Sequence, residues 1–244
     1  MIYDFMILRI WKQISLCFLL MISGVAAANM TVYPMSVIIG SSGEGAGMIQ
    51  IHSKSEETQF VKVTVKRVLQ PATPQEHEEV VSNWDGSGLV VSQPKFALPA
   101  GASKVIRIVS LNAPNIEEVY RVYFERVPLP AEAEENSVDS GGDVSVNLIW
   151  GVLVRVIPAT RQVALELDGA GVLQNTGNIR VTLLEIGVCA DKDDASCQWT
   201  TLNKNIYPGN GLSVPGLVLS STLRVKYQLE DASEILIKSL APIR

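Results

Sequence analysis

The sequence predicts an all-β fold that consists of two β-sandwich domains. Short segments rich in β-branched and aromatic residues recur along the chain, turn residues separate them, and no long amphipathic helical pattern is present. The strand pattern restarts after Pro158, and the chain is long enough for two domains of about 100–150 residues. We therefore expect a first sandwich of about seven strands and a smaller second one.

The first 28 residues have the features of a secretory signal peptide. Arg9 and Lys12 precede an apolar run from Ile14 to Ile22, and three alanines end at Ala28, where a peptidase would cut. A retained membrane anchor is the alternative, but the run is shorter than the ~20 residues that span a bilayer. We therefore expect cleavage near Ala28, a mature chain that starts at Asn29, and no stable membrane insertion.

Cleavage changes both the charge and the cysteine content. The net charge goes from −5 to −6, because the removed segment carries two basic residues and one acidic residue, and so acidic a chain is not expected to bind nucleic acid. Cys17 is lost, which leaves Cys189 and Cys197 as a pair. In an oxidising compartment we expect them to form a disulfide, since a redox or metal pair lacks the CxxC spacing and a nearby histidine.

The expected strands divide at a short junction, residues 158–160, which is too short to act as a flexible tether. We assign residues 29–158 to the first domain and residues 159–244 to the second. The expected strands are Thr31–Ile39, Gly47–His52, Gln59–Leu69, Leu89–Ser92, Ser103–Val109, Val119–Val127 and Val144–Ile157 in the first domain, and Gln162–Leu167, Gly171–Gln174, Ile179–Ile186, Leu212–Val214, Ser221–Gln228 and Ile235–Ile237 in the second.

The last strand of the first domain is unusually long. Val144, Val146, Leu148 and Trp150 recur at every second position, and from Gly151 onward the strand is almost continuously apolar. Residues 144–157 would extend about 46 Å, whereas ordinary strands have ~5–6 residues. Residues 144–154 carry no charge or proline, the devices that normally protect an exposed edge. We therefore predict that the first half of this strand pairs with another chain.

A second interpretation of this segment stays open. Two buried core strands joined by a bend at Gly151 would also give this pattern, and strands that face a core are common. The preceding stretch, residues 131–142, is acidic and poor in apolar residues, and we expect it to be ordered only by a partner.

No catalytic or metal-binding motif is recognisable. The two histidines, His52 and His77, have no nucleophile or carboxylate partner in a known pattern, and GxSxG, HExxH, P-loop and dinucleotide fingerprints are missing. The acidic cluster of Asp191, Asp193 and Asp194 lacks the glycine and terminal glutamate of a calcium loop, so a solvated turn is the better interpretation. We expect no enzymatic activity, no cofactor and no metal site.

Several motifs occur together in a fixed order. Residues 89–108 (LVVSQPKFALPAGASKVIRI) form a proline-punctuated crossing that leads to an arginine, residues 118–128 (EVYRVYFERVP) form a strand that ends at a proline, and residues 175–186 (NTGNIRVTLLEI) place an Asn-Thr turn before a strand. Together with TVYPMSVII at 31–39 and NKNIYPG at 203–209, they resemble periplasmic pilus-assembly chaperones of the chaperone–usher pathway, in the alternate branch that serves class 5 fimbriae.

This resemblance implies a fold, a location and a function. Such chaperones are non-enzymatic proteins of the Gram-negative periplasm, with two immunoglobulin-like domains set in an L. They lend a long edge strand to fimbrial subunits that lack their own last strand, prevent these subunits from aggregating, and deliver them to an outer-membrane usher. The donated row would be Val144, Val146, Leu148 and Trp150. Whether the free protein self-associates through this strand is left open.

The resemblance also implies a basic anchor for the C-terminal carboxylate of the fimbrial subunit in the cleft between the domains. Better-studied branches use an arginine on the first strand and a lysine on the donor strand. Here Ser36 stands at the arginine position and the lysine is missing, so Arg155, Arg121 and Arg107 are the candidates. Arg155 has a second interpretation, in which it locks the domains together through Glu125 or an acid of the second domain.

Two other functions belong to different classes. A secreted fimbrial subunit or adhesin with immunoglobulin-like domains should carry an N-terminal donor segment ahead of an incomplete sandwich, whereas the mature chain enters a strand at Thr31. A secreted hydrolase on a β-sandwich is disfavoured, because the sequence lacks a recognisable nucleophile–base pair.

Overall fold

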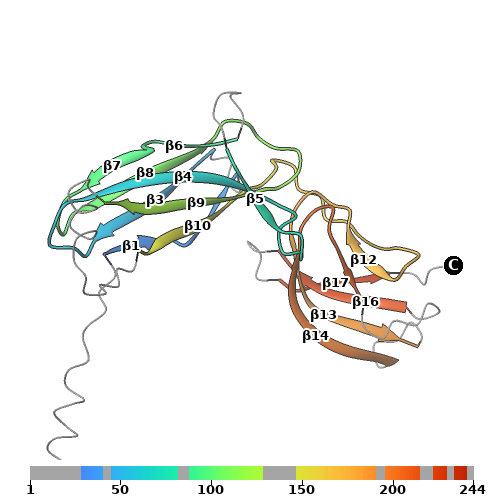
Figure 1. Cartoon of the computed structure of the whole chain (residues 1–244). Helices are drawn as coiled ribbons and strands as arrows, with labels where there is room; N and C mark the ends of the chain where they lie inside the picture. The colour runs from blue at the N-terminus through green and yellow to red at the C-terminus, as the bar shows by residue number, and fades with distance from the viewer. Residues whose placement is uncertain are drawn as a thin grey trace, which may run out of the picture.

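The computed structural model describes residues 29–40, 45–81, 88–128, 147–190, 196–214, 222–229 and 234–240. The regular elements in these ranges are all strands, and they form four sheets. Two sheets precede Pro158 and two follow it, and Figure 1 shows them as two separate groups of strands. The predicted all-β fold with two sandwich domains is therefore confirmed. Within the described ranges, no helix has the length and apolar character needed to cross a membrane.

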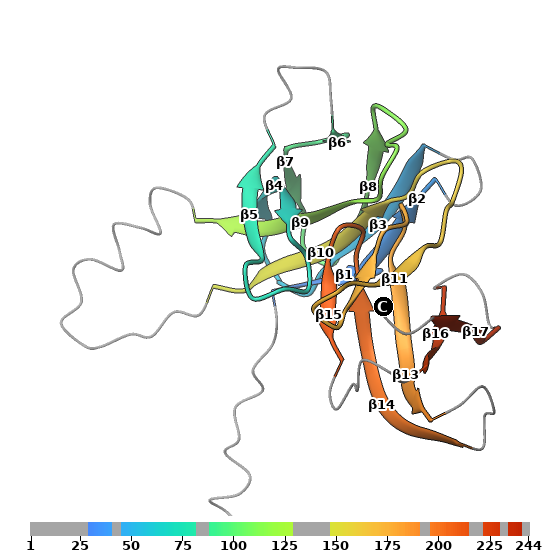
Figure 2. The same cartoon turned by 90° about the vertical axis from the view of Figure 1, so that its right-hand side faces the viewer.

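The N-terminal domain contains two facing sheets, which Figure 2 shows as two layers. One sheet has the order β1-β3-β8-β6, and the other has the order β2-β10-β9-β4-β5, with β7 also pairing with β4. The strands are β1 (Met30–Tyr33), β2 (Ser36–Ile39), β3 (Ala46–Ser53), β4 (Gln59–Leu69), β5 (His77–Val80), β6 (Leu89–Val91), β7 (Lys95–Leu98), β8 (Ser103–Ser110), β9 (Glu118–Val127) and β10 (Ile149–Val156).

The core of this domain lies between the two sheets. On β4 the side chains of Val61, Val63 and Val65 are buried, while the residues between them face outward. On β9 Val122 and Phe124 are fully buried in the same way. This alternation follows from the two-residue repeat of a strand, so each strand presents one apolar row to the opposite sheet.

The first expected strand is split between the two sheets. We predicted one strand over Thr31–Ile39, but β1 pairs with β3 in one sheet and β2 pairs with β10 in the other. The break falls at Pro34, which has no backbone N–H to donate to a ladder. The chain therefore changes sheets at this proline.

The C-terminal domain has one sheet with the order β11-β12-β15 and another with the order β14-β13-β16-β17. Its strands are β11 (Leu165–Leu167), β12 (Val172–Asn175), β13 (Val181–Cys189), β14 (Cys197–Ile206), β15 (Gly211–Ser213), β16 (Thr222–Gln228) and β17 (Leu236–Leu240). Leu165, Leu173, Leu183 and Leu223 are fully buried in its core.

The predicted disulfide between Cys189 and Cys197 is confirmed. It joins the last residue of β13 to the first residue of β14, where the two cysteines face each other across the ladder. The predicted acidic turn at Asp191, Asp193 and Asp194 lies outside the described residues.

The two domains contact each other directly. Tyr207 of the C-terminal domain packs against Val68 and Val119 of the N-terminal domain. The side-chain amide of Asn178 donates to the carbonyl of Asn115 at 3.1 Å, and that of Asn210 donates to the carbonyl of Pro71 at 3.0 Å. Apolar packing and hydrogen bonds therefore connect the two domains across the junction. The L-shaped arrangement and the boundary after Pro158 stay predictions.

Candidate functional site

The two edges of β10 differ in how far they are paired. On one side β10 pairs with β9 along its whole length, from Ile149 opposite Glu125 to Val156 opposite Glu118. On the other side β2 pairs only with Leu153–Val156. Among the described residues, no strand pairs with the second side of Ile149–Val152, and we call this stretch the open edge. Its backbone groups are available to a further strand.

One row of side chains runs along β10 from the core to the open edge. Val152, Val154 and Val156 are buried in the N-terminal core, and Trp150 is half-buried against the same core. Leu148 precedes them by the same two-residue spacing and is 49% exposed. The other two members of the predicted donor row, residues 144 and 146, lie outside the described residues. The row is therefore buried from Val152 to Val156, half-buried at Trp150 and half exposed at Leu148.

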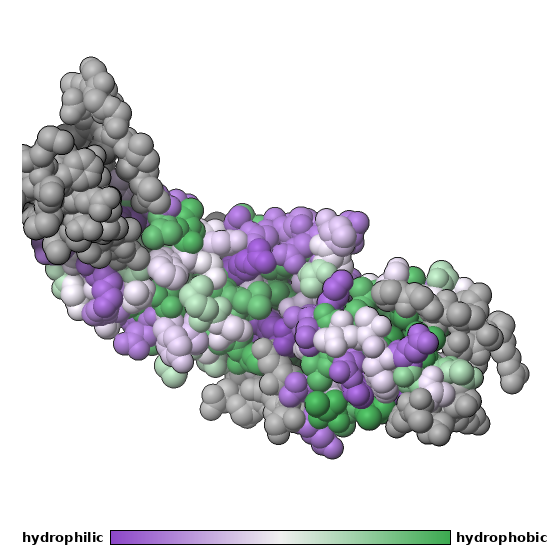
Figure 3. Space-filling model, turned by 90° about the horizontal axis from the view of Figure 1, so that it is seen from below, coloured by the Kyte–Doolittle hydropathy of each residue, from purple (hydrophilic) through white to green (hydrophobic). Residues whose placement is uncertain are grey.

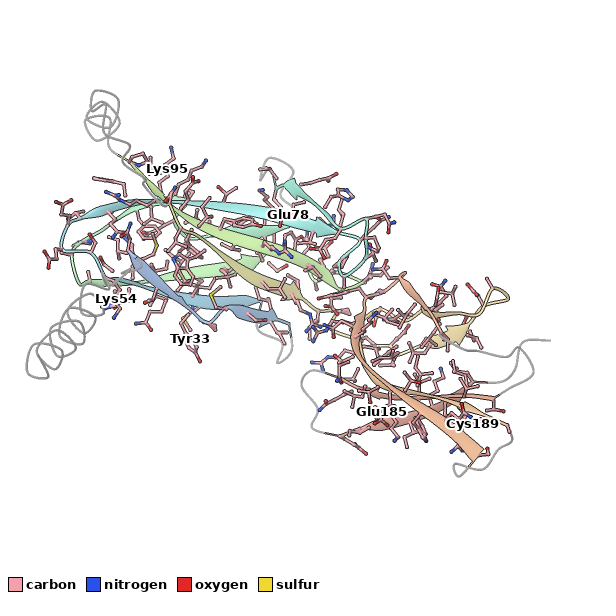
Figure 4. The ribbon with its side chains drawn as sticks, turned by 60° about the horizontal axis from the view of Figure 1, so that its bottom comes forward. Tyr33, Lys54, Glu78, Lys95, Glu185 and Cys189 are labelled. Carbon is pink, nitrogen blue, oxygen red and sulfur yellow. A yellow bond between two sulfur atoms is a disulfide. The ribbon has the colours of Figure 1, made fainter. Side chains whose placement is uncertain are left out.

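Further apolar side chains are exposed near this edge. Ile149 is 53% exposed, Met35, which directly precedes β2, is 44% exposed, and Tyr33, the last residue of β1, is 76% exposed. Figure 4 shows Tyr33 projecting away from the domain. Figure 3 views the molecule from below and shows hydrophobic residues exposed among polar ones on both domains. An exposed apolar group beside unpaired backbone is the arrangement expected for a surface that binds another chain.

Gly151 does not bend β10. The strand continues through Gly151, which lies opposite Tyr123 on β9. A Cβ atom on Gly151 would lie 3.0 Å from Cε1 of Tyr123, so the glycine makes room for the aromatic ring. The bend at Gly151 that the alternative required is therefore not seen in the described part of the strand, whereas residues 144–146 lie outside the described residues.

Arg155 lies at the junction between the domains. It is 3% exposed, and its Nε donates to Oε1 of Glu117 at 2.5 Å. The other carboxylate oxygen of Glu117 accepts the backbone N–H of Arg180, in the C-terminal domain, at 2.6 Å. Glu117 therefore connects β10 to the second domain. We had expected Glu125 or a second-domain acid as the partner, but Glu125 lies opposite Ile149, six residues and about 20 Å along the strand from Arg155.

Arg180 is a further candidate functional residue, and it was not predicted from the sequence. Burial, together with the nearby charge of Arg155, holds the pKa of Arg180 below its ordinary value, although Tyr207 and Glu117 oppose this shift. Its guanidinium carbon lies 5.9 Å from the centre of the Tyr207 ring. The signal available in the sequence was a single cation directly before the apolar strand β13. The junction thus brings two arginines close to Glu117.

Arg121 lies on the outer face of the same sheet and is part of an ionic network. Its two terminal nitrogens contact Glu76 and Glu78, each at 2.8 Å. Oε1 of Glu78 also accepts the hydroxyl of Tyr123 at 2.6 Å, and Oε2 lies 3.2 Å from Nζ of Lys66. We call Lys66, Glu76, Glu78, Arg121 and Tyr123 the β5–β9 network.

The β5–β9 network shifts the pKa values of Glu78 and Arg121. Burial raises the pKa of Glu78, but hydrogen bonds from Tyr123, Arg121 and Lys66 together outweigh it and hold that pKa below its ordinary value. Burial lowers the pKa of Arg121, but the nearby Glu78 and Tyr123 raise it by more. The pKa of Arg121 therefore lies above its ordinary value. The charged forms of both partners are thus favoured.

Arg107 is separated from the other two candidate arginines. It lies on β8, in the opposite sheet, faces solvent, and pairs with Met48 in the ladder. Its backbone N–H donates to the hydroxyl of Ser92 at 3.1 Å. The structure therefore places Arg155 and Arg121 on neighbouring strands and Arg107 on another layer of the sandwich.

Two β-sandwiches in direct contact and a strand with one open edge are the arrangement expected of proteins that bind other chains by strand addition. No family model matches the chain. Two proteins of Escherichia coli, both named as fimbrial subunits, are similar to it. The one named for CFA/I fimbriae is 37% identical over 205 residues, which are 81% of this chain and 84% of the relative. The one named for CS1 fimbriae is 40% identical over 201 residues, which are 79% and 82% of the two chains.

Solved structures give the same relationship. The crystal structure of the class 5 fimbriae chaperone CfaA has a TM-score of 0.71 and 32% identity, and covers 88% of this chain and 100% of that one. A chain in the chaperone–tip adhesin complex of CFA/I fimbriae biogenesis has a TM-score of 0.75, 32% identity and the same coverage. This chain therefore belongs to the periplasmic chaperones of the chaperone–usher pathway, in the branch of the class 5 fimbriae. It is a fimbrial chaperone, although the two E. coli relatives are named as subunits.

Proposed function

We propose that this chaperone binds fimbrial subunits by lending them the first half of its long strand. The open edge of β10 carries this proposal, because β2 begins at Ser36, opposite Leu153, and leaves Ile149–Val152 without a described partner on that side. A subunit strand that pairs here would continue the sheet beyond β2. Backbone hydrogen bonds would then supply affinity, and the alternate side chains would supply specificity.

The ladder with β9 leaves room for the donor strand to lengthen. β9 extends to Val127, two residues past Glu125, which is the last partner of β10. If the antiparallel register continues, Leu148 lies opposite Arg126 and Asn147 lies opposite Val127. A captured fimbrial subunit would therefore extend β10 along a strand that is already in place, because β4 pairs with β9 up to Val127.

The side chains of the donor row supply the apolar contacts. Val144, Val146, Leu148 and Trp150 would enter the incomplete core of the fimbrial subunit. Each fully buried side chain of this kind contributes about 1.5–3 kcal/mol. Three or four of them would protect a fimbrial protein that otherwise exposes its core to water. The proposed role is binding, with no catalytic step.

We place the carboxylate anchor at the domain junction, with Arg155 as its principal residue. Arg155 and Arg180 approach Glu117 closely enough that the charge of Arg155 lowers the pKa of Arg180. A second carboxylate beside these groups would reduce the repulsion between the two guanidinium groups. Arg121 is a weaker candidate, because Glu76 and Glu78 already surround it with negative charge. Arg107 is the weakest, because it lies on the opposite sheet.

The same proposal covers export and delivery. Residues 1–28 would direct the chain to the periplasm and be removed near Ala28, and the loaded chaperone would deliver its cargo to an outer-membrane usher. The disulfide between Cys189 and Cys197 is compatible with an oxidising compartment. Mass spectrometry of the chaperone from a periplasmic extract should give a chain that begins at Asn29, and a retained leader would contradict this part of the proposal.

A substitution at the open edge tests the capture of fimbrial subunits. Leu148→Asp places a charge in the donor row where the side chain is already half exposed, so the free chaperone should stay folded and lose capture. Val105→Asp is the matched control, because Val105 is similarly exposed, at 54%, on the other sheet. The measurement is recovery of a class 5 fimbrial subunit co-expressed in a periplasm. Unchanged recovery with Leu148→Asp would exclude strand donation at this position.

A further inference from the structure

Tyr123 covers the outer face of β10 at the open edge. The residue lies on β9 directly opposite Gly151, and its ring occupies the space where a Gly151 side chain would be. A Cβ atom at Gly151 would lie 3.0 Å from Cε1, 3.3 Å from Cδ1 and 3.7 Å from Cζ of the ring. Three ring atoms this near the Cβ position of Gly151 show that the ring lies over the strand where the glycine has no side chain.

The position of the ring is fixed from its other end. The hydroxyl of Tyr123 donates to Glu78 at 2.6 Å, and Nζ of Lys66 lies 5.0 Å from the ring centre. Glu78 is bound in turn by Arg121 at 2.8 Å. Glu78 comes from β5, whose side chains are otherwise mostly exposed, and Figure 4 shows it on this strand. The β5–β9 network therefore holds Tyr123 against β10.

The contact falls on the half of β10 that has least support. Leu153–Val156 is paired on both sides, whereas Ile149–Val152 is paired only with β9 in the described structure. A strand paired on one side opens more readily than a central strand. Binding by strand addition is strongest when the receiving edge is already extended, since ordering it on binding reduces affinity.

We propose that Tyr123 is a positioning residue that clamps the open edge of β10 in its extended conformation through Gly151. The clamp rests on the proposed function, because its purpose is to prepare this edge for a strand of the fimbrial subunit. It favours glycine at position 151, since a Cβ there would push the ring away by a few tenths of an ångström. It also gives the β5–β9 network a function beyond surface charge pairing.

Hydrogen exchange of the free mature chaperone tests the clamp without a fimbrial partner. Gly151→Ala should displace the ring and speed the exchange of the Trp150 and Val152 amides, which point toward β9 because the N–H of Leu153 points toward β2, by about tenfold, while Val154 and Val156 stay protected. Gly169→Ala is the matched control, because a Cβ there would contact nothing within 4 Å. Exchange at Trp150 and Val152 as slow as in the unaltered protein would overturn the proposal.

A double-substitution cycle separates positioning from general destabilisation. Tyr123→Ala alone should speed exchange of the same amides and slow subunit capture by about fivefold. If Gly151 acts through Tyr123, adding Gly151→Ala to that variant should cause little further change. Additive effects, or faster exchange spread equally over β3 and β8, would show a merely structural role. Tyr123→Phe keeps the ring and loses the hydrogen bond to Glu78, so its effect should be intermediate.

The cycle also distinguishes this proposal from the proposed function. If Leu148→Asp abolishes capture and Gly151→Ala changes neither exchange nor capture, only the clamp is overturned. If Leu148→Asp leaves capture intact, strand donation fails at that position, and the exchange measurement still decides whether the clamp exists.

Discussion

The two halves of β10 have similar side chains and different surroundings. Val154 and Val156 lie where β10 is the neighbour of both β2 and β9, and they are 0% and 2% exposed. Leu148 and Ile149 lie where only β9 is present in the described structure, and they are 49% and 53% exposed. The difference in pairing follows from the start of β2, which begins only after Pro34 and Met35 and therefore reaches Leu153–Val156 alone. Both halves are apolar, and the length of β2 decides which part of β10 keeps an unpaired edge.

A charge placed in the covered half should have the largest effect. Val154→Asp buries an unpaired carboxylate in a core position that is 0% exposed, which costs several kcal/mol, about enough to unfold an ordinary domain. We expect the N-terminal domain to be unfolded at 25 °C, as measured by near-ultraviolet circular dichroism.

The contrast with Leu148→Asp sharpens the comparison. That variant should keep a native spectrum and lose only subunit capture. Equal loss of structure in the two variants would mean that both halves of β10 serve the chaperone's own core.

Breaking the buried ion pair at the covered end should have the next largest effect. Arg155→Ala leaves Glu117, whose side chain is 0% exposed, without its guanidinium partner, and such a change costs about 3–5 kcal/mol. Urea unfolding should show this loss. Glu117 also accepts the N–H of Arg180, so the cross-domain contact should weaken too.

A paired substitution separates the two roles of Arg155. Arg155→Met with Glu117→Leu removes both charges and keeps apolar volume, so stability should largely return. Subunit capture should stay low if Arg155 anchors the carboxylate. Full capture by this double variant would leave Arg155 with the domain-bracing role alone.

The sequence predicted the strands whose own side chains are apolar and missed those that depend on partners. The pattern of β9 and β10 follows from alternating apolar residues, and both were expected. β5 has the sequence HEEV and is mostly exposed, so only its ladder with β4 and its ion pairs identify it as a strand. β14 was missed for a similar reason, since its exposed polar residues and a register irregularity opposite Leu183 obscure the two-residue period.

The site was predictable to a similar extent. The length of the donor strand and the isolation of Arg155 are visible in the sequence. The role of Glu117 is not visible in the sequence, because this residue precedes the apolar strand. It contacts Arg155, 38 residues away in the chain, only through the antiparallel register. The room that Gly151 gives Tyr123 is equally invisible, since a glycine in a strand also fits a bend.

The smallest expected effect concerns the pH dependence of the open half. The pKa of Glu78 is lowered in the folded protein from its ordinary value of 4.5, so the charged network adds stability above about pH 4.5 and loses it as the pH falls through the folded value. Glu78→Gln should remove this dependence. The stability of the unaltered protein should therefore fall more than that of the variant between pH 6 and pH 3, by at most about 1 kcal/mol, as expected for a network near the surface.

Glu79→Gln is the matched control for this prediction. Glu79 is the exposed neighbour of Glu78 on β5, and its substitution removes the same charge. The measurement is urea unfolding across this pH range, combined with hydrogen exchange of Trp150 and Val152, expressed as protection relative to the intrinsic exchange rate at each pH. If Tyr123 transmits the network to β10, the protection of these two amides should fall at low pH in the unaltered protein and in Glu79→Gln. It should be reduced already at pH 6 in Glu78→Gln, since the neutral amide is a weaker acceptor for Tyr123 and Arg121. The covered half, Leu153–Val156, should show none of this change, because β2 and β9 hold it from both sides.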